Sequence, residues 1–224
     1  WRDWSSDVCS SDLNSVPIIL ASSREVYGNL GRRENPVSET EADFRSSPSP
    51  YAAMKLAGEA LASSYFRCYG LPYSILRFSN VYGRYDDDLA RLERAIWVFN
   101  AMIKAGRPVT VFGAEKTLDF TYIDDAVDGL VRCLHRLVAG DPDVRASTFN
   151  VAHGTGHSLI GVVKLIAMTR NLQPDIRVES SRPGEVTWYV ADITRARDAL
   201  GYRPQTPVTT GIPRAITEAM SRGS

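Results

Sequence analysis

A serine, a tyrosine and a lysine near the start of the chain have types and spacing suited to proton and hydride chemistry. Tyr51 and Lys55, in the run YAAMK, are four residues apart and share one face of any helix that contains them. A free tyrosine has a pKa of about 10, and a nearby ammonium favours its phenolate form. Such a tyrosine can take a hydroxyl proton while a hydride leaves the same carbon. Ser23 could hold the oxygen as it becomes a carbonyl.

The sequence around this trio predicts how it is positioned. Ser49 offers an N-cap and Pro50 a first-turn proline for a helix that Gly70 ends. Val16–Ser22, a short apolar run, predicts a parallel strand buried on both faces. Ser23 follows this strand, and active sites of open parallel sheets form beyond the carboxyl ends of their strands. We therefore expect a site here, although a tyrosine and a lysine at this spacing are also common on solvated helix surfaces.

Strands and helices alternate along the rest of the chain, a pattern that favours βαβ units and a parallel sheet. Cap and turn residues bound most of these elements. The predicted elements are strand Tyr73–Phe78, a helix from Ala95 in AIWVFNAMIKAG, strand Val109–Phe112, helix Ile123–Gly140, strand Thr148–Ala152, helix Ser158–Thr169, strand Asp175–Glu179, a helix capped by Asp192 and ended by Gly201, and a helix from about Thr209 to Met220.

Composition narrows the class of protein. The 224 residues carry 26 basic and 26 acidic side chains, so the formal net charge of zero gives no reason to expect a nucleic-acid partner. The apolar runs are too short to span a bilayer, and we expect no membrane partner and a cytoplasmic location. The cysteines and histidines lack metal-ligand spacing, and we expect no metal site; these residues are Cys9, Cys68, Cys133, His135, His153 and His157.

Residues 1–13, WRDWSSDVCSSDL, differ in residue pattern from the rest of the chain. They show no hydrophobic period, and Asp3–Leu13 can be encoded without a gap by a string that resembles a common sequencing-library adapter. We interpret this segment as a non-native artefact and leave it out of the fold. The genuine sequence would then begin in the middle of a gene.

From Val16 to the C-terminus the chain contains a set of short motifs in a fixed order. The motifs are ILASSREVYG, SPYAAMK, LRFSNVYG, VTVFG, LDFTYIDD, FNVAHGTGHSL and RPGEV. Each motif alone is weak, whereas their order is specific. This ordered set resembles the NAD-dependent epimerase/dehydratase family of the extended short-chain dehydrogenases/reductases. Within that family the chain is most similar to the UDP-glucose 4-epimerases.

The resemblance implies roles for single residues. Ser23 would bind the substrate oxygen, Tyr51 would be the general base, and Lys55 would tune it and hold the nicotinamide ribose. The remaining implied contacts are Phe78 with the NAD cofactor, Asn80 and Arg182 with the sugar diphosphate, and Phe112 beside the nucleotide. Phe112 fits a core position equally well, whereas an arginine before Pro-Gly has little packing purpose.

The chain departs from the family pattern at three places. Leu118 stands where an arginine usually helps bind phosphate, and Lys116 could supply the second cation of the clamp instead. Glu25 matches a glutamate of the family's dehydratases and decarboxylases rather than the small residue of many epimerases. Arg24 takes the position of the acidic proton donor of 4,6-dehydratases, and a cation cannot do that work. Dehydration is therefore disfavoured, and decarboxylation stays open.

The glycine-rich turn that would hold the NAD pyrophosphate is absent before Val16. Gly154 and Gly156 mimic it, but the third glycine, Gly161, comes too late for a GxGxxG fingerprint. We interpret this segment as a tight turn in a substrate-binding cap. Without the glycine turn we expect the chain on its own to be inactive.

The sequence thus predicts an α/β fold, the C-terminal part of a Rossmann-type parallel sheet plus a small α/β substrate-binding cap. Residues 14–94 would carry the Rossmann part, and 95–224 mainly the cap with interleaved Rossmann elements. The predicted activity is NAD-dependent epimerisation of a nucleotide sugar at C4 through a 4-keto sugar, in a parent enzyme that is a homodimer. The alternatives are a decarboxylase or dehydratase of the same family and a noncatalytic NAD-binding scaffold.

Overall fold

The computed structural model describes residues 16–47, 49–84, 86, 94–182 and 185–222; the segment 1–13 lies outside them. It contains a three-stranded parallel sheet in the order β1-β2-β6, formed by Ile18–Ser23, Tyr73–Phe78 and Ser147–Val151. Ser23 pairs with Phe78, and Phe78 pairs with Val151. The carboxyl ends of the three strands therefore meet at one edge, as the predicted α/β fold requires.

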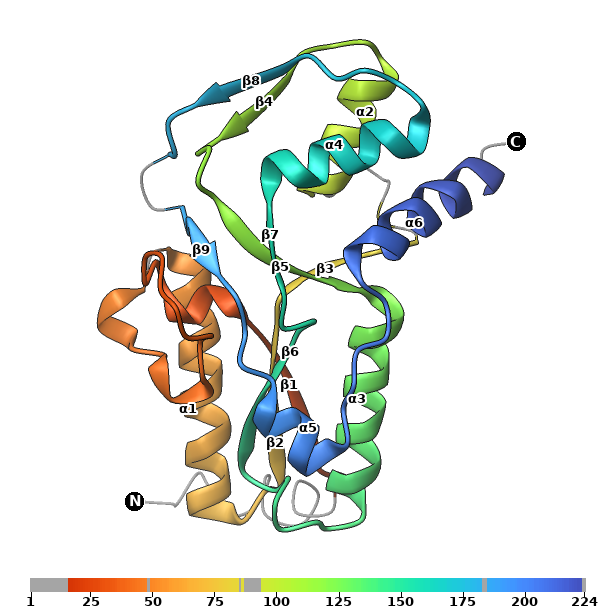
Figure 1. Cartoon of the computed structure of the whole chain (residues 1–224). Helices are drawn as coiled ribbons and strands as arrows, with labels where there is room; N and C mark the ends of the chain where they lie inside the picture. Colours follow the sequence, from red (N-terminus) through yellow and green to blue (C-terminus); the bar gives the residue numbers. More distant parts are fainter. Residues whose placement is uncertain (1–15, 48, 85, 87–93, 183–184, 223–224) are drawn as a thin grey trace.

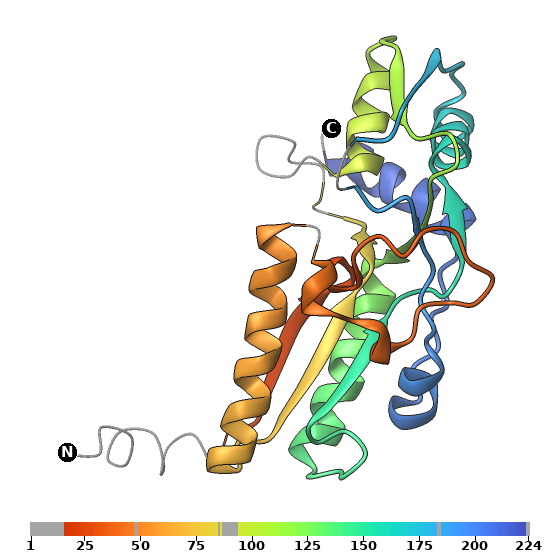
Figure 2. The ribbon, with the colours of Figure 1, turned by 90° about the vertical axis from the view of Figure 1, so that its left-hand side faces the viewer.

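Two long helices flank this sheet (Figure 1). α1, Pro50–Tyr69, begins where the backbone N–H of Ala52 donates to the Ser49 hydroxyl over 3.2 Å, and it ends at Gly70 with a left-handed φ of 71°. α1 runs alongside β1, as Figure 2 also shows. α3, Ile123–Val138, carries acidic residues in its first turn and basic ones in its last, as the helix dipole prefers. Both predicted helices are confirmed.

β1 corrects one expectation. It pairs only with β2 among the described strands, and its side chains are mostly half-buried or exposed, with Ile18 at 39%. β1 is the last strand of the described sheet, so one of its sides has no neighbouring strand to cover its side chains, although α1 packs against it. Its neighbour β2 is covered on both faces, and five of its six residues are buried.

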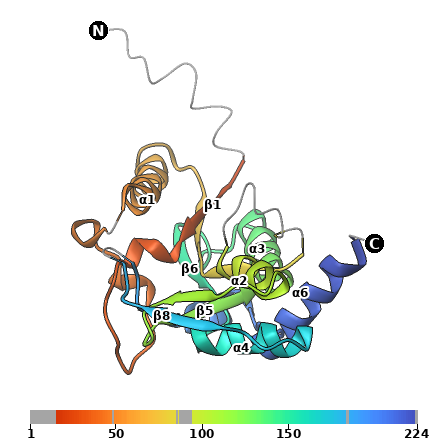
Figure 3. The same ribbon diagram turned by 90° about the horizontal axis from the view of Figure 1, so that it is seen from above.

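A second region contains two paired strands and three helices (Figure 1). β4, Val109–Phe112, pairs in parallel with β8, Ile176–Glu179. Helix α2, Ala95–Lys104, packs on α4, Leu159–Arg170, which in turn contacts α6, Val208–Arg222. Seen from above, these three helices lie apart from α1 (Figure 3).

Four short strands, absent from the sequence prediction, connect the two regions. β5, Thr117–Tyr122, pairs with β3, Asn80–Tyr82, with β7, Gly156–Ser158, and with β9, Trp188–Tyr189. β3, β7 and β9 have only two or three residues and are too short to show a hydrophobic period. β5 has six residues that alternate polar and apolar, the period of a strand, so its pattern could have predicted it.

The structure corrects the predicted N-cap of one helix, α5, Thr194–Leu200. Ile193 occupies its N-cap position, whereas Asp192 was predicted to do so. Asp192 lies one residue earlier and still accepts a hydrogen bond from the backbone N–H of Thr194 over 2.8 Å. Gly201 ends α5 in the left-handed conformation, as predicted.

Apolar side chains gather in two clusters. One fills the space between the three-stranded sheet, α3 and α5, and includes Leu76, Leu137, Phe149 and Tyr202. The larger cluster lies among β5, α2, α4 and α6 and includes Trp97, Phe120, Ile166 and Ile212. The division into segments 14–94 and 95–224 stays a prediction. β6 and α5, both from the second segment, pack in the cluster of the sheet.

A buried ion pair fixes how α1 sits on the sheet. Glu59 of α1 and Arg77 of β2 are 8% and 5% exposed, and two hydrogen bonds of 3.0 and 2.6 Å join the guanidinium to the carboxylate. The Ser22 hydroxyl donates to the same carboxylate, and Arg77 also donates to the Tyr27 hydroxyl over 3.1 Å. Because these partners lie on separate elements, sliding or rotating α1 would leave buried charge unpaired. The pair thereby positions the first turns of α1 relative to Ser23.

Candidate active site

The predicted trio lines one cavity of about 560 Å³. Ser23 comes from the end of β1, while Tyr51 and Lys55 come from the first turns of α1. The Lys55 ammonium donates to the carbonyl of Ala21 over 2.9 Å and lies 5.5 Å from the centre of the Tyr51 ring. Tyr51 is 47% exposed, so a ligand can reach its ring and hydroxyl.

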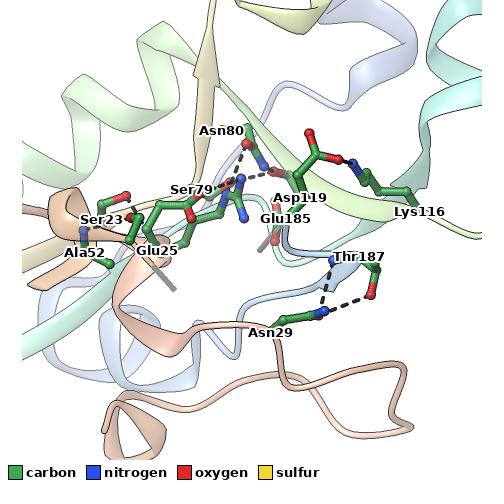
Figure 4. Close-up of polar contacts among 12 residues, drawn as sticks. Ser23, Glu25, Asn29, Ala52, Ser79, Asn80, Lys116, Asp119, Glu185 and Thr187 are labelled. Atoms are coloured by element: carbon green, nitrogen blue, oxygen red, sulfur yellow. Dashed lines mark hydrogen bonds and ion pairs between the residues drawn. The ribbon is translucent and has the colours of Figure 1, made fainter. Parts of the chain in front are cut away.

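Two more predicted residues line the same cavity. Phe78 ends β2, beside Ser23 in the sheet register, and is half-buried. Asn80 begins β3, and both ends of its amide are held. Its Oδ1 accepts from Arg24 Nε over 3.1 Å, and its Nδ2 donates to the Asp119 carbonyl over 2.7 Å (Figure 4). Its second amide N–H can still serve a ligand.

A second cavity, of about 680 Å³, adjoins the first. Arg24, Glu25, Asn80 and Ala95 line both. Phe112 at the end of β4 lines the second cavity and is half-buried, which places it outside the buried core. A ligand could therefore extend continuously from the Ser23 cavity to Phe112.

The second cavity holds two of the predicted cations. The Arg182 guanidinium lies over the face of the Phe112 ring at 3.9 Å, a cation–π contact. Lys116 is 6% exposed and donates to Glu185 over 2.8 Å. Burial acts to raise the pKa of the Glu185 carboxyl, but the hydrogen bonds from Lys116 and from the Arg182 backbone N–H, together with the charges of these two residues, outweigh it and lower the pKa. The charge of Lys116 is thus already offset, and Leu118, also in the lining, adds none.

Asp119, which sequence reasoning missed, is a fully buried carboxylate of β5. It accepts backbone N–H groups from His153, Gly154 and Ala191 over 3.1, 2.9 and 3.3 Å. Burial raises the pKa of Asp119 to about 7, although these three donors favour its charged form. Its backbone carbonyl holds Asn80, so Asp119 ties one cavity wall to two loops. The signal in the sequence was a charged residue between the apolar residues Leu118 and Phe120.

Asp119 also explains the turn that mimics a dinucleotide fingerprint. Gly154 has a φ of 81°, which favours glycine, and donates its N–H to the Asp119 carboxylate. The strand β7 then separates this turn from α4. The turn is therefore a strand-to-strand connection held to β5, rather than the direct strand-to-helix turn of a dinucleotide fingerprint, and its assignment to a substrate-binding cap stays a prediction.

The described ranges hold neither a helix long and apolar enough to cross a membrane nor a group of three or more histidine, cysteine or acidic side chains arranged to hold a metal.

Comparison with known proteins defines the family. A family model described as GDP-mannose 4,6 dehydratase matches residues 7–215. The chain belongs to this family of NAD-dependent nucleotide-sugar epimerases and dehydratases. Since the match begins within residues 1–13, the origin of that segment stays a prediction.

The similar curated proteins include 4-epimerases. The chain is 33% identical over 203 residues to an uncharacterized UDP-glucose epimerase of Bacillus subtilis, covering 88% of this chain and 58% of that protein. It is 32% identical over 198 residues to a UDP-glucose 4-epimerase of Mycolicibacterium smegmatis, covering 88% and 59%. The chain therefore spans somewhat more than half the length of these relatives.

Solved structures agree with the fold. A UDP-glucose 4-epimerase of Thermotoga maritima with UDP-glucose superposes with a TM-score of 0.80 at 25% identity, covering 92% of this chain and 64% of the other. A UDP-glucuronic acid 4-epimerase of Bacillus cereus, solved with UDP-glucuronic acid and NAD, gives 0.79 at 26% identity, covering 91% and 61%.

Proposed function

We propose that the enzyme to which this chain belongs epimerises a UDP-linked sugar at C4 with bound NAD. The observation that carries the proposal is the continuity of the two cavities, because Ser23, Tyr51 and Lys55 line one, and Phe112 and Arg182 line the other. The sugar would lie in the first cavity and the nucleotide diphosphate in the second. NAD would supply the hydride acceptor.

In this reaction each residue has a distinct task. Tyr51 would take the proton from the C4 hydroxyl, and Ser23 would donate a hydrogen bond to the oxygen as the carbonyl forms. Lys55, already next to the Tyr51 ring, would favour the phenolate and hold the nicotinamide ribose. Tyr51 and Lys55 lie on an accessible cavity wall beside Phe78, and this arrangement fits the cofactor's nicotinamide end.

The ion pair of Glu25 supports epimerisation over decarboxylation. The Glu25 carboxylate lies 2.8 Å from Arg24 Nη2, so it is already engaged with a cation. A noncatalytic NAD-binding scaffold would not need Ser23, Tyr51 and Lys55 to line the same cavity.

We also propose that the enzyme to which this chain belongs assembles as a homodimer.

The activity can be tested in the chain extended at its N-terminus to the length of its relatives. Supplied separately with UDP-glucose and UDP-glucuronate, this protein should form the 4-epimer of at least one of them without net NADH release, because the hydride returns to the sugar. Chromatography of the products and NADH fluorescence measure both quantities. Formation of UDP-xylose with carbon dioxide would instead make the protein a decarboxylase, and no conversion at all would favour the scaffold.

The binding affinity for the nucleotide diphosphate should depend on Arg182. Arg182→Ala removes the guanidinium over Phe112, and hydrogen bonds to charged groups contribute about 1.5–3 kcal/mol each, so affinity for UDP should fall roughly tenfold or more. Titration calorimetry with UDP measures this, and Arg177→Ala on β8, 64% exposed and paired with Asp175, is the matched control. Equal affinities in the two variants would place the diphosphate elsewhere.

A further inference from the structure

Arg24 lies at the junction of the two cavities and lines both. Only 12% of its side chain is exposed. Its guanidinium is held on two sides, by Asn80 Oδ1 on Nε and by Glu25 on Nη2, and it lies 5.8 Å from the centre of the Tyr189 ring. Arg24 is therefore an ordered cation within the site rather than a flexible surface side chain.

The third nitrogen of this guanidinium has no acceptor. Nη1 is buried, and no hydrogen-bond partner is found for it among the described residues. The nearby Asp119 carboxylate hydrogen-bonds to backbone N–H groups instead. A buried donor of a charged group without a partner is unfavourable, so a ligand oxygen that supplied the acceptor would gain affinity.

The charge of the Ser23 cavity favours an anion. Among the described residues, its ionisable cations are Arg24, Lys55 and Arg94, against the single carboxylate of Glu25. Arg94 is paired with Asp86 over 2.8 Å, and Glu25 together with the buried Asp119 offsets part of the Arg24 charge, whereas Lys55 has no carboxylate beside it in the cavity lining. The cavity keeps a positive excess, and an incoming carboxylate would be attracted by it.

The position of Arg24 relative to Ser23 indicates which anionic group of the ligand it would bind. Arg24 follows Ser23 directly in the chain and shares its cavity, whereas Arg182 and Phe112 lie only in the second cavity. In a hexuronate, the carboxylate is bonded to C5, the neighbour of the C4 carbon whose oxygen Ser23 would bind. On the basis of the proposed function, we propose that the sugar accepted by this site carries a carboxylate, and that Arg24 binds it.

The test is calorimetric binding of UDP, UDP-glucose and UDP-glucuronate to the 224-residue chain. We expect UDP-glucuronate to bind roughly tenfold or more tightly than UDP-glucose. Arg24→Gln should abolish this preference while UDP binds as in the wild type. Arg24→Lys keeps the positive charge but loses the planar set of N–H donors of the guanidinium, so it should retain part of the preference. Arg132→Gln, an exposed α3 position, should change nothing.

The outcomes separate this inference from the proposed function. Equal affinity of the wild type for the two sugars, or an unchanged preference in Arg24→Gln, would overturn the role of Arg24. Loss of UDP affinity in Arg24→Gln would assign Arg24 to the diphosphate and overturn it as well. If Arg24→Gln does not fold, Arg24→Lys decides, and a full wild-type preference in it contradicts the inference. Failure of the wild type to bind any UDP compound would contradict the proposed function itself.

Discussion

Replacing Tyr51 by phenylalanine should reduce turnover about 10²–10⁴-fold, the usual contribution of a general base, in the chain extended to the length of its relatives. The phenol oxygen is the only group removed, and the ring next to Lys55 remains. Binding of the nucleotide sugar should therefore change little. Rates of 4-epimer formation, together with calorimetry for the same substrate, separate the two effects.

Tyr65→Phe is the matched control for that variant. Tyr65 lies on the same helix, is 38% exposed and is outside the cavity lining. Its ring lies 5.6 Å from that of Tyr69 in a tilted contact that phenylalanine can keep, so the substitution should leave turnover within a small factor of the wild type. If the Tyr51 and Tyr65 variants retained the same turnover, Tyr51 would not be the base.

Replacing Arg77 by methionine should lower the free energy of unfolding by about 3–5 kcal/mol, because it leaves the Glu59 carboxylate buried without its cation. Urea denaturation of the 224-residue chain measures this difference. The matched control is Arg132→Met on α3, whose partner Asp128 lies 2.7 Å away on an exposed surface. An exposed pair of this kind contributes about 0–1 kcal/mol.

The double variant Glu59→Met/Arg77→Met tests the physical cause. Two apolar side chains remove the unpaired charge, so much of the lost stability should return. A loss in Arg77→Met no larger than that in Arg132→Met would mean that the buried pair does not hold α1 on the sheet. A double variant less stable than Arg77→Met would assign the loss to packing rather than to charge.

Local signals in the sequence predicted the elements that carry the catalytic trio. The cap at Ser49 and the stop at Gly70 predicted the bounds of α1, and strand Tyr73–Phe78 is β2 without a shift. Caps and hydrophobic runs act over a few neighbouring residues, so they can be recognised without knowing what packs on them. The spacing of Tyr51 and Lys55 then follows from helix geometry alone.

The short strands and the fixed orientation of Asn80 could not be predicted in this way. Asn80 is held by Arg24 and by the carbonyl of Asp119, positions 56 and 39 residues away. Nothing in the run RFSN tells which partners the fold will bring to that amide. The short strand β9 likewise exists because β5 offers it a hydrogen-bonding edge.

The sequence by itself determined the α/β fold, the long helices and the residue types available for proton transfer, because these depend on short-range periodicity and side-chain chemistry. Only the tertiary structure decided that Phe112 lines a cavity and that Lys116 forms an ion pair with Glu185. It also decided that Nη1 of Arg24 has no hydrogen-bond partner among the described residues at the place where the two cavities meet. Such facts depend on burial and on partners distant in the chain, and these are set only when the separate elements pack together.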